Sequence, residues 1–393
     1  MRARVASWLA CGTSLLAASC GLESHELLAL REPAVESDQS PARGSPPGVP
    51  SNRLSALNIY EDMEEGSISK AAIEFVPDYP LWSDGVVKRR WIILPESTQI
   101  DTHDMEHWRY PLGTIVVKEF SIDGVRLETR VVEKVAETGR LKKDISLRTY
   151  VWNDAQTEAV LTQDGVVDVL STTHNVPKQK LCITCHGGEP GGVLGFSALQ
   201  LSESGTLKKL AKRGLFSDPP TKSYRIPGND VERQAIGYLH ANCGHCHTEG
   251  TRTDFMRMRV LLNELDLPLT EWQLYKTSVD QDLVKWSTRP EQFTKRIVPG
   301  DAEASAVFVR MNQRDTEESQ DQQMPPLATE LIDVQAVSLV RSWIDGMSQR
   351  DVDAGSADAG NDADADIDAE TSADAEPDTD AGIDASAETM APP

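Results

Sequence analysis

Two short segments of the chain combine the residue types that hold a metal-containing cofactor. In residues 182–186, which read CITCH, and in residues 243–247, which read CGHCH, two spaced cysteines are followed at once by a histidine. Thiols at this spacing reach the two vinyl groups of one haem, and the next residue brings an imidazole under the iron. The spacing predicts two covalent c-type haems, with Cys182, Cys185, Cys243 and Cys246 as attachment residues and His186 and His247 as proximal iron ligands.

The same cysteine spacing also occurs in zinc sites and in redox-active dithiols. A zinc site made of the four cysteines would leave both following histidines unexplained. A thioredoxin-like dithiol belongs to a βαβ unit, and neither motif has that pattern around it. The chain has six cysteines, and the other two are Cys11 and Cys20, so no pair remains for a structural disulfide. We favour haem attachment, with zinc binding as the alternative.

Met324 is the expected sixth ligand of the second haem. It begins the segment Met-Pro-Pro-Leu, residues 324–327. The two prolines remove backbone N–H donors and stiffen the loop that presents the thioether. Histidine and methionine form a standard axial pair that raises the haem potential, which suits an electron carrier. Met311 is expected to serve only in core packing.

The sixth ligand of the first haem stays open in the sequence. His174 precedes the first motif, and His240 lies one turn before the second. Met256 and Met258 follow the second motif and offer thioethers. An iron with an open or water-ligated position is the remaining alternative, and such an iron can carry out chemistry.

Elements of regular structure must position these groups. Apolar residues recur at helical spacing from Asp230 to the second motif, so Asp230 is expected to cap a helix there. Asp333 is expected to cap another helix near the end of the folded part. Gly237 would let these two helices approach closely. Before the first motif, β-branched and aromatic runs bounded by turn residues predict strands at 91–94, 114–120, 125–132 and 149–152.

Three segments around the second motif resemble a known family. They are residues 238–247, 296–301 and 324–327, and together they resemble bacterial envelope dihaem c-type cytochromes. The haem domain of that family is shared with planctomycete-type cytochrome c domains. The resemblance extends over about residues 55–347 and implies haem binding, with His247 and Met324 as ligands, and electron transfer. One departure is Ala328, which stands where the family usually has glycine.

The two ends of the chain are expected to lie outside the folded part. A basic start, an apolar stretch and small residues predict a signal peptide over 1–19, with Cys20 as a lipidated first mature residue. A proline-rich linker is expected to follow the lipid anchor and to end at residue 54. The last residues, 351–393, hold fourteen acidic side chains and no Lys or Arg, out of a net charge of −23. Such a tail should be disordered, and the acidic balance argues against nucleic acid as a partner.

These observations predict an α+β multidomain fold. A β-rich domain precedes mostly α, cytochrome c-like haem domains, and a disordered acidic tail follows them. The expected boundaries are 1–19 for the signal peptide, 20–54 for the anchor and linker, 55–175 for the β-rich domain, 176–228 for the first haem-binding segment, 229–349 for the cytochrome c domain and 350–393 for the tail.

The predicted function is electron transfer by a dihaem cytochrome of the bacterial envelope, anchored to a membrane through lipid on the periplasmic side or the cell surface. Its redox partner protein is not identified by the sequence. The alternative is a dihaem oxidoreductase, such as a peroxidase or the haem subunit of an envelope dehydrogenase, and an open iron would distinguish it. A third hypothesis is a sensing or binding module in which haem is structural.

Overall fold

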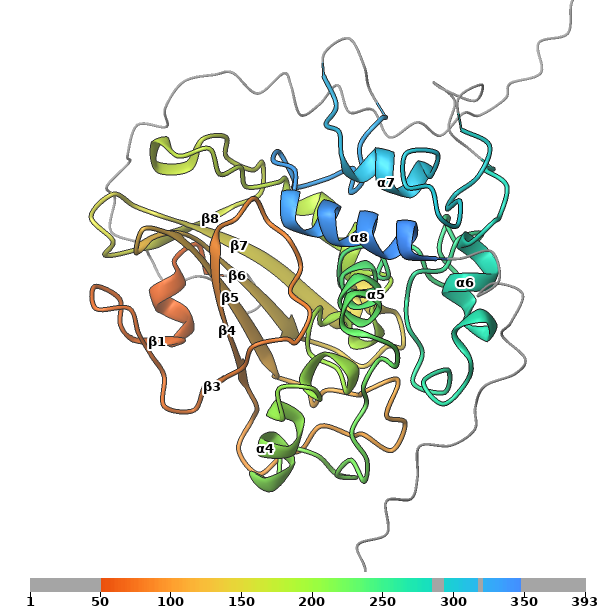
Figure 1. Cartoon of the computed structure of the whole chain (residues 1–393). Coiled ribbons are helices and arrows are strands. Elements are labelled where there is room, and N and C mark those ends of the chain that lie inside the picture. Colours follow the sequence, from red (N-terminus) through yellow and green to blue (C-terminus); the bar gives the residue numbers. More distant parts are fainter. Residues whose placement is uncertain (1–50, 285–292, 317–320, 348–393) are drawn as a thin grey trace, which may run out of the picture. The chain divides into compact units, whose positions relative to one another are not determined.

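An antiparallel sheet of six strands dominates the structure (Figure 1), a computed structural model that describes residues 51–284, 293–316 and 321–347. Its strands follow the order of the chain, so each pairs with its neighbour in sequence. A separate two-stranded sheet joins β1 (Tyr60–Asp62) and β2 (Ser67–Ile68). The six strands are β3 (Ile73–Glu74), β4 (Val87–Ile93), β5 (Ile115–Ile122), β6 (Val125–Lys134), β7 (Ile145–Trp152) and β8 (Ala159–Thr162).

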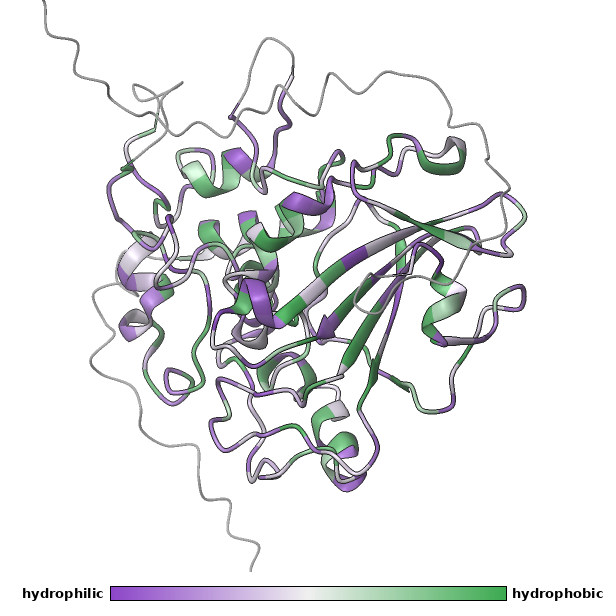
Figure 2. Ribbon diagram, turned by 180° about the vertical axis from the view of Figure 1, so that it is seen from behind, coloured by the Kyte–Doolittle hydropathy of each residue, from purple (hydrophilic) through white to green (hydrophobic). Residues whose placement is uncertain are grey.

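The four apolar runs expected as strands overlap β4, β5, β6 and β7, and residues 94 and 114 lie just outside the observed strands. Val, Ile and aromatic side chains favour the pleated backbone, because their branched or planar side chains pack on neighbours across the strands. The Asp-Gly pair at 123–124 forms the two-residue turn that joins β5 to β6. Hydrophilic residues interrupt the hydrophobic stretches along the strands (Figure 2).

The two faces of the sheet pack against different parts of the chain. On one face Trp91, Val117 and Val131 are aligned across β4, β5 and β6, and they are buried together with Leu54 from the first described residues. On the other face Ile92 and Val116 are paired in register and join the largest apolar core. That core also contains residues from the part that carries the two CxxCH motifs.

The helices are short apart from two of 13 residues. The helices are α2 (Leu141–Asp144), α3 (Cys182–His186), α4 (Thr206–Lys212), α5 (Asp230–Asn242), α6 (Gln273–Ser278), α7 (Ala306–Met311) and α8 (Val334–Gly346). Single 3₁₀ turns are η1 (Leu54–Leu57), η2 (Val169–Ser171), η3 (Gln179–Leu181), η4 (Pro190–Gly192), η5 (Leu199–Leu201) and η6 (Leu269–Glu271).

The predicted fold class is wrong. The described residues are β-rich, with a six-stranded and a two-stranded antiparallel sheet, and they contain no clear helical cytochrome domain. The physical reason lies in the segments between α5 and α8. Only α6 and α7, of six residues each, form there among the described residues, and isolated turns and loops make up the rest. Among the described residues, only α5 and α8 reach a length of 13 residues.

The two long helices pack on each other (Figure 1), but two details differ from expectation. Asn229, not Asp230, caps α5, because its extended backbone lets Oδ1 accept a hydrogen bond from Glu232 N at 3.0 Å. Asp333 caps α8 as predicted, accepting from Ala336 N at 3.0 Å. The close neighbour of Gly237 is Tyr79 rather than α8, since a Cβ on Gly237 would lie 2.1 Å from the Tyr79 ring.

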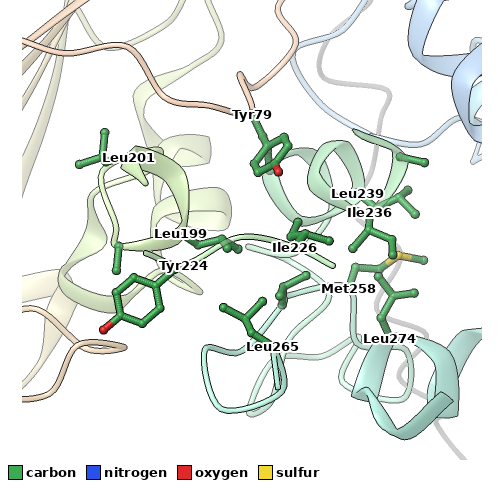
Figure 3. Packing of buried hydrophobic residues seen from close by; sticks show 14 of the residues in the cluster. Tyr79, Leu199, Leu201, Tyr224, Ile226, Ile236, Leu239, Met258, Leu265 and Leu274 are labelled. Carbon is green, nitrogen blue, oxygen red and sulfur yellow. The ribbon is translucent and has the colours of Figure 1, made fainter. Parts of the chain in front are cut away.

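The largest core joins α5 to the segments that follow it (Figure 3). Ile236 and Leu239 of α5 lie beside Met258 and Leu274, and all four side chains are buried. Among residues 51–284, 293–316 and 321–347, no helix is long and apolar enough to cross a membrane. The predicted signal peptide, lipidated Cys20 and acidic tail lie outside the described residues.

Candidate functional site

The first motif forms the single helical turn α3, which is fixed to the sheet from its N-terminal side. Just before it, Gln179 of η3 donates its backbone N–H to Gln163 O at 2.9 Å. The Gln179 side chain also donates to the carbonyl of Leu147 in β7. Cys182 therefore starts its turn from a point attached to two segments of the sheet region.

His186 is oriented as a metal ligand would be. Its Nδ1 lies 2.7 Å from the carbonyl oxygen of Gly192, and because a carbonyl can only accept, Nδ1 carries the proton. The other nitrogen, Nε2, is then left with a lone pair for a metal. Burial lowers the pKa of His186 to about 4, so the ring is neutral at neutral pH. Gly192 has φ of 74°, and a Cβ there would meet Ile145 at 2.6 Å, so this loop needs glycine.

The second motif continues directly from α5. Its turn is closed by backbone hydrogen bonds from Cys243 N to Leu239 O at 2.9 Å and from His247 N to Cys243 O at 2.8 Å. His247 is buried, and its Nδ1 has no hydrogen-bond partner within the described part of the chain. Burial lowers the pKa of His247 to about 4. A neutral, buried imidazole with an unpaired nitrogen is a site that calls for a partner.

The two motifs lie in direct contact, which the sequence did not predict. Ligand atoms of Cys185, His245 and Cys246 all lie within 4.8 Å of one another. The Cys246 thiol lies 3.7 Å from the carbonyl oxygen of Thr184. A Cβ on Gly188 would lie 1.9 Å from the carbonyl oxygen of His245, so only glycine allows this approach. Residue spacing did not indicate His245 as a ligand, because it lies between Cys243 and Cys246, which were already assigned to haem attachment.

The thiols of the two motifs perturb each other. A hydrogen bond from the Cys246 thiol, helped by His245, holds the pKa of Cys185 well below its usual value. The same bond raises the pKa of Cys246. Burial raises the pKa of Cys243 to about 12. All four motif cysteines are free thiols and partly exposed, which is the state from which thioether bonds form.

Met324, the expected sixth ligand, lies near the first cysteine of the second motif. Met324 and Cys243 line one cleft, together with Tyr238, Met311 and Val337. The cleft is too small for a porphyrin ring. Two thiols at the attachment spacing, the neutral imidazole of His247 and the thioether of Met324 are the donor types that hold haem c, although Cys246 and His247 do not line this cleft.

The Met324 loop is held by a segment that leads into β4. Asp84 accepts hydrogen bonds from the backbone N–H groups of Glu330 at 2.9 Å and Leu331 at 2.8 Å. Trp82 Nε1 donates to the carbonyl of Leu331 at 3.1 Å. The backbone of Trp82 is itself held by Asn242, the last residue of α5. The predicted ligand loop, α5 and the sheet region are thus connected.

A buried charge network links the two motifs. Arg259 donates to Glu189 at 2.7 Å and lies 3.3 Å from Glu106. Glu189 follows the first motif by three residues, and Glu106 belongs to the sheet region. Burial raises the pKa of Glu189, and the positive charge of Arg259 opposes that rise.

The four candidates for the sixth ligand of the first haem are engaged in other contacts. His174 Nε2 lies 2.8 Å from Glu128 Oε1 in a buried pair. His240 accepts a hydrogen bond from Val260 N at Nδ1, 3.1 Å away, and burial lowers its pKa to about 3. Met258 is buried in the core, and Met256 packs against it.

No family model matches the chain, and no curated protein or solved structure is significantly similar to it.

Proposed function

We propose that the chain is a dihaem c-type cytochrome that transfers electrons in the bacterial cell envelope. The observation that carries the proposal is the contact between the two CxxCH turns, in which Cys185 and Cys246 lie together. Haems attached to these two turns would lie near each other, and electron transfer becomes faster as the distance between two cofactors shrinks. The resemblance to envelope dihaem cytochromes is a further reason for this choice.

The axial groups support a carrier at the second haem. His247 is neutral and buried, and Met324 lines the same cleft as Cys243. A haem closed on both sides by protein ligands exchanges electrons without binding substrate. Anchoring through lipid on Cys20, location in the periplasm or on the cell surface, and an unidentified redox partner protein belong to the same proposal.

One observation favours catalysis at the first haem as a second candidate function. His240 and Met258 are engaged in other contacts, and His174 binds Glu128 through Nε2, so that only its buried Nδ1 has no hydrogen-bond partner among the described residues. An iron bound by His186 alone would leave an open position for a substrate such as a peroxide. The chain would then be a dihaem oxidoreductase.

A zinc site is the competing chemistry for the same residues. The cluster of Cys185, His245 and Cys246 has two thiols and one imidazole within 4.8 Å. Three such ligands and water would complete a tetrahedral zinc site. Zinc there and thioethers to haem exclude each other, because each needs the same sulfurs.

A redox titration followed by optical spectra tests the proposal on protein matured in a host that attaches haem. Two reversible one-electron transitions are expected, and hydrogen peroxide should leave the spectrum of the reduced second haem unchanged in the first seconds. Rapid turnover of peroxide would favour the oxidoreductase. Bound zinc with no haem spectrum would contradict both haem functions.

A further inference from the structure

Three cations stand side by side on one face of the sheet. Arg90 in β4 is paired in register with Lys118 in β5, and Lys118 is paired with Arg130 in β6. Residues paired in register point to the same face, and like charges directly opposite each other destabilise a sheet. We call these three residues the cation row. Something other than strand pairing must offset its repulsion.

Among the described residues, a carboxylate neutralises the cation row only at the Arg130 end. Arg130 binds Glu128 through two hydrogen bonds, of 2.8 Å and 2.6 Å. Glu128 also binds His174, so its charge is shared. It is the one carboxylate that pairs with the cation row among the described residues.

Arg90 and Lys118 have no carboxylate within ion-pairing distance in residues 51–284, 293–316 and 321–347. Arg90 is a buried residue, with 5 % of its surface exposed. Among the described residues, its guanidinium donates only to the carbonyl oxygen of Lys88, at 3.3 Å. Lys118 Nζ lies over the ring of Phe120, 5.8 Å from its centroid. Burying a charge without a partner is strongly unfavourable, even after the surrounding protein relaxes. The row therefore lacks an anionic partner.

The row faces the part of the molecule that holds the first motif. Its neighbours on the same face are Ile92 and Val116, two residues further along each strand, and they enter the core shared with the motif-bearing part. Gln179, three residues before Cys182, donates to the carbonyl of Leu147 in β7, and Leu147 is paired in register with Val132, which lies two residues from Arg130 on the same face. A group attached to the first motif would lie within reach of the row.

We propose that the cation row, Arg90, Lys118 and Arg130, binds the propionates of the haem attached at Cys182 and Cys185. Haem carries two carboxylates, which match the two cations that lack a partner and leave Arg130 shared with Glu128. This inference rests on the proposed function, since it needs haem at the first motif. Cations beside the propionates also raise the potential of that haem, because they offset negative charge near the iron.

The test is a redox titration of matured full-length protein carrying Lys118→Gln. One of the two midpoint potentials should fall by about 59 mV, a tenfold change in the ratio of oxidised to reduced haem. That potential should also become more dependent on pH near neutrality, because propionates without their cation bind protons more readily. Lys118→Arg should retain the wild-type potential. Lys208→Gln on α4 removes an exposed cation and is the matched control.

A second variant identifies the haem concerned. In protein with Cys182→Ser and Cys185→Ser, one haem remains, and Lys118→Gln should not move its potential. If Lys118→Gln fails to fold, Lys118→Met is measured in its place. Methionine has a similar length and carries no charge, so it can replace an unpaired lysine between strands. It should lower the same potential.

Two results would overturn the inference. Coincident titration curves for wild type and Lys118→Gln, with both haems present by mass, would show that the row does not touch the haem. A thermal midpoint raised by inorganic phosphate in the wild type, and not in Lys118→Gln, would then assign the row to a free anion. Absence of haem from the wild type would instead contradict the proposed function itself.

Discussion

Asp84 Oδ1 lies 2.8 Å from the backbone nitrogen of Leu331, and this contact joins the sheet region to the loop of Met324. The same carboxylate accepts from Glu330 N. A segment before β4 therefore sets the path of the loop that carries the expected axial ligand.

Replacing Asp84 should loosen that loop. Asp84→Ala removes the acceptor of two exposed backbone N–H groups, and because water can take its place, each loss should cost about 0.5–1.5 kcal/mol. Asp84→Asn keeps one acceptor oxygen and should lose less stability. Urea unfolding measures the stability, and the visible band of thioether-bound ferric haem measures the occupancy of Met324. A loss of stability with the band unchanged would show that Asp84 does not position Met324.

Arg259 should be among the most sensitive positions in the chain. Arg259→Met leaves Glu189 and Glu106 buried without their cation, and breaking a buried pair from one side costs about 3–5 kcal/mol. Adding Glu189→Gln should restore part of the loss, because it removes an unpaired charge. Arg341→Met, which breaks an exposed pair with Glu303, should cost about 1 kcal/mol or less. Equal effects of the two arginine substitutions would contradict the network.

Because of Glu128, the free energy of unfolding should decrease as the pH falls into the acid range. Burial alone would raise its pKa, but Arg130 and His174 together outweigh burial and hold the pKa below its ordinary value. A carboxyl with a lowered folded pKa binds fewer protons when folded, so its stabilisation is full above the unfolded pKa and is lost as pH falls through the folded one.

Unfolding of Glu128→Gln measured between about pH 2 and pH 7 tests this effect. The variant should be less stable than the wild type near neutrality, because Arg130 loses its partner. The two stabilities should converge in acid. Glu61→Gln changes an exposed carboxyl and is the control. Parallel curves for wild type and Glu128→Gln would contradict the assignment.

In protein made without haem, Cys185 should be the most reactive thiol. The hydrogen bond from Cys246 lowers the pKa of Cys185, whereas burial raises that of Cys243. Since the thiolate is the nucleophile, iodoacetamide should modify Cys185 several-fold faster near neutral pH. Peptide mass spectrometry gives the rate at each site. Cys246→Ala should slow the reaction at Cys185, and an unchanged rate would show that the contact between the motifs does not form.

Part of the fold was predictable from local pattern. The β-branched and aromatic runs in β4 to β7 and the Asp-Gly turn after β5 are signals within a few residues. Asp333 was recognised as a cap because the helix that follows it has a regular apolar face. Asn229 was missed since Asp230 is equally suited by residue type, and only the backbone distinguishes the two positions.

The helical cytochrome domain was a wrong prediction because it followed from short motifs rather than from periodicity. Motif residues can keep their spacing on an isolated turn, as residues 182–186 do in α3, without long helices around them. The contact between Cys185 and Cys246 joins residues about sixty positions apart, and no local pattern encodes it. The cation row is likewise visible only when strand register is known, since Arg90, Lys118 and Arg130 lie on three strands.

The intact mass of the mature chain, with a pyridine haemochrome titration, tests haem attachment most directly. The protein should be produced with haem-attachment machinery and compared with Cys243→Ser combined with Cys246→Ser. Two haems per chain in the wild type and one in the variant are expected. A wild-type chain with no covalent haem, purified with zinc on Cys185, His245 and Cys246, would contradict the cytochrome function.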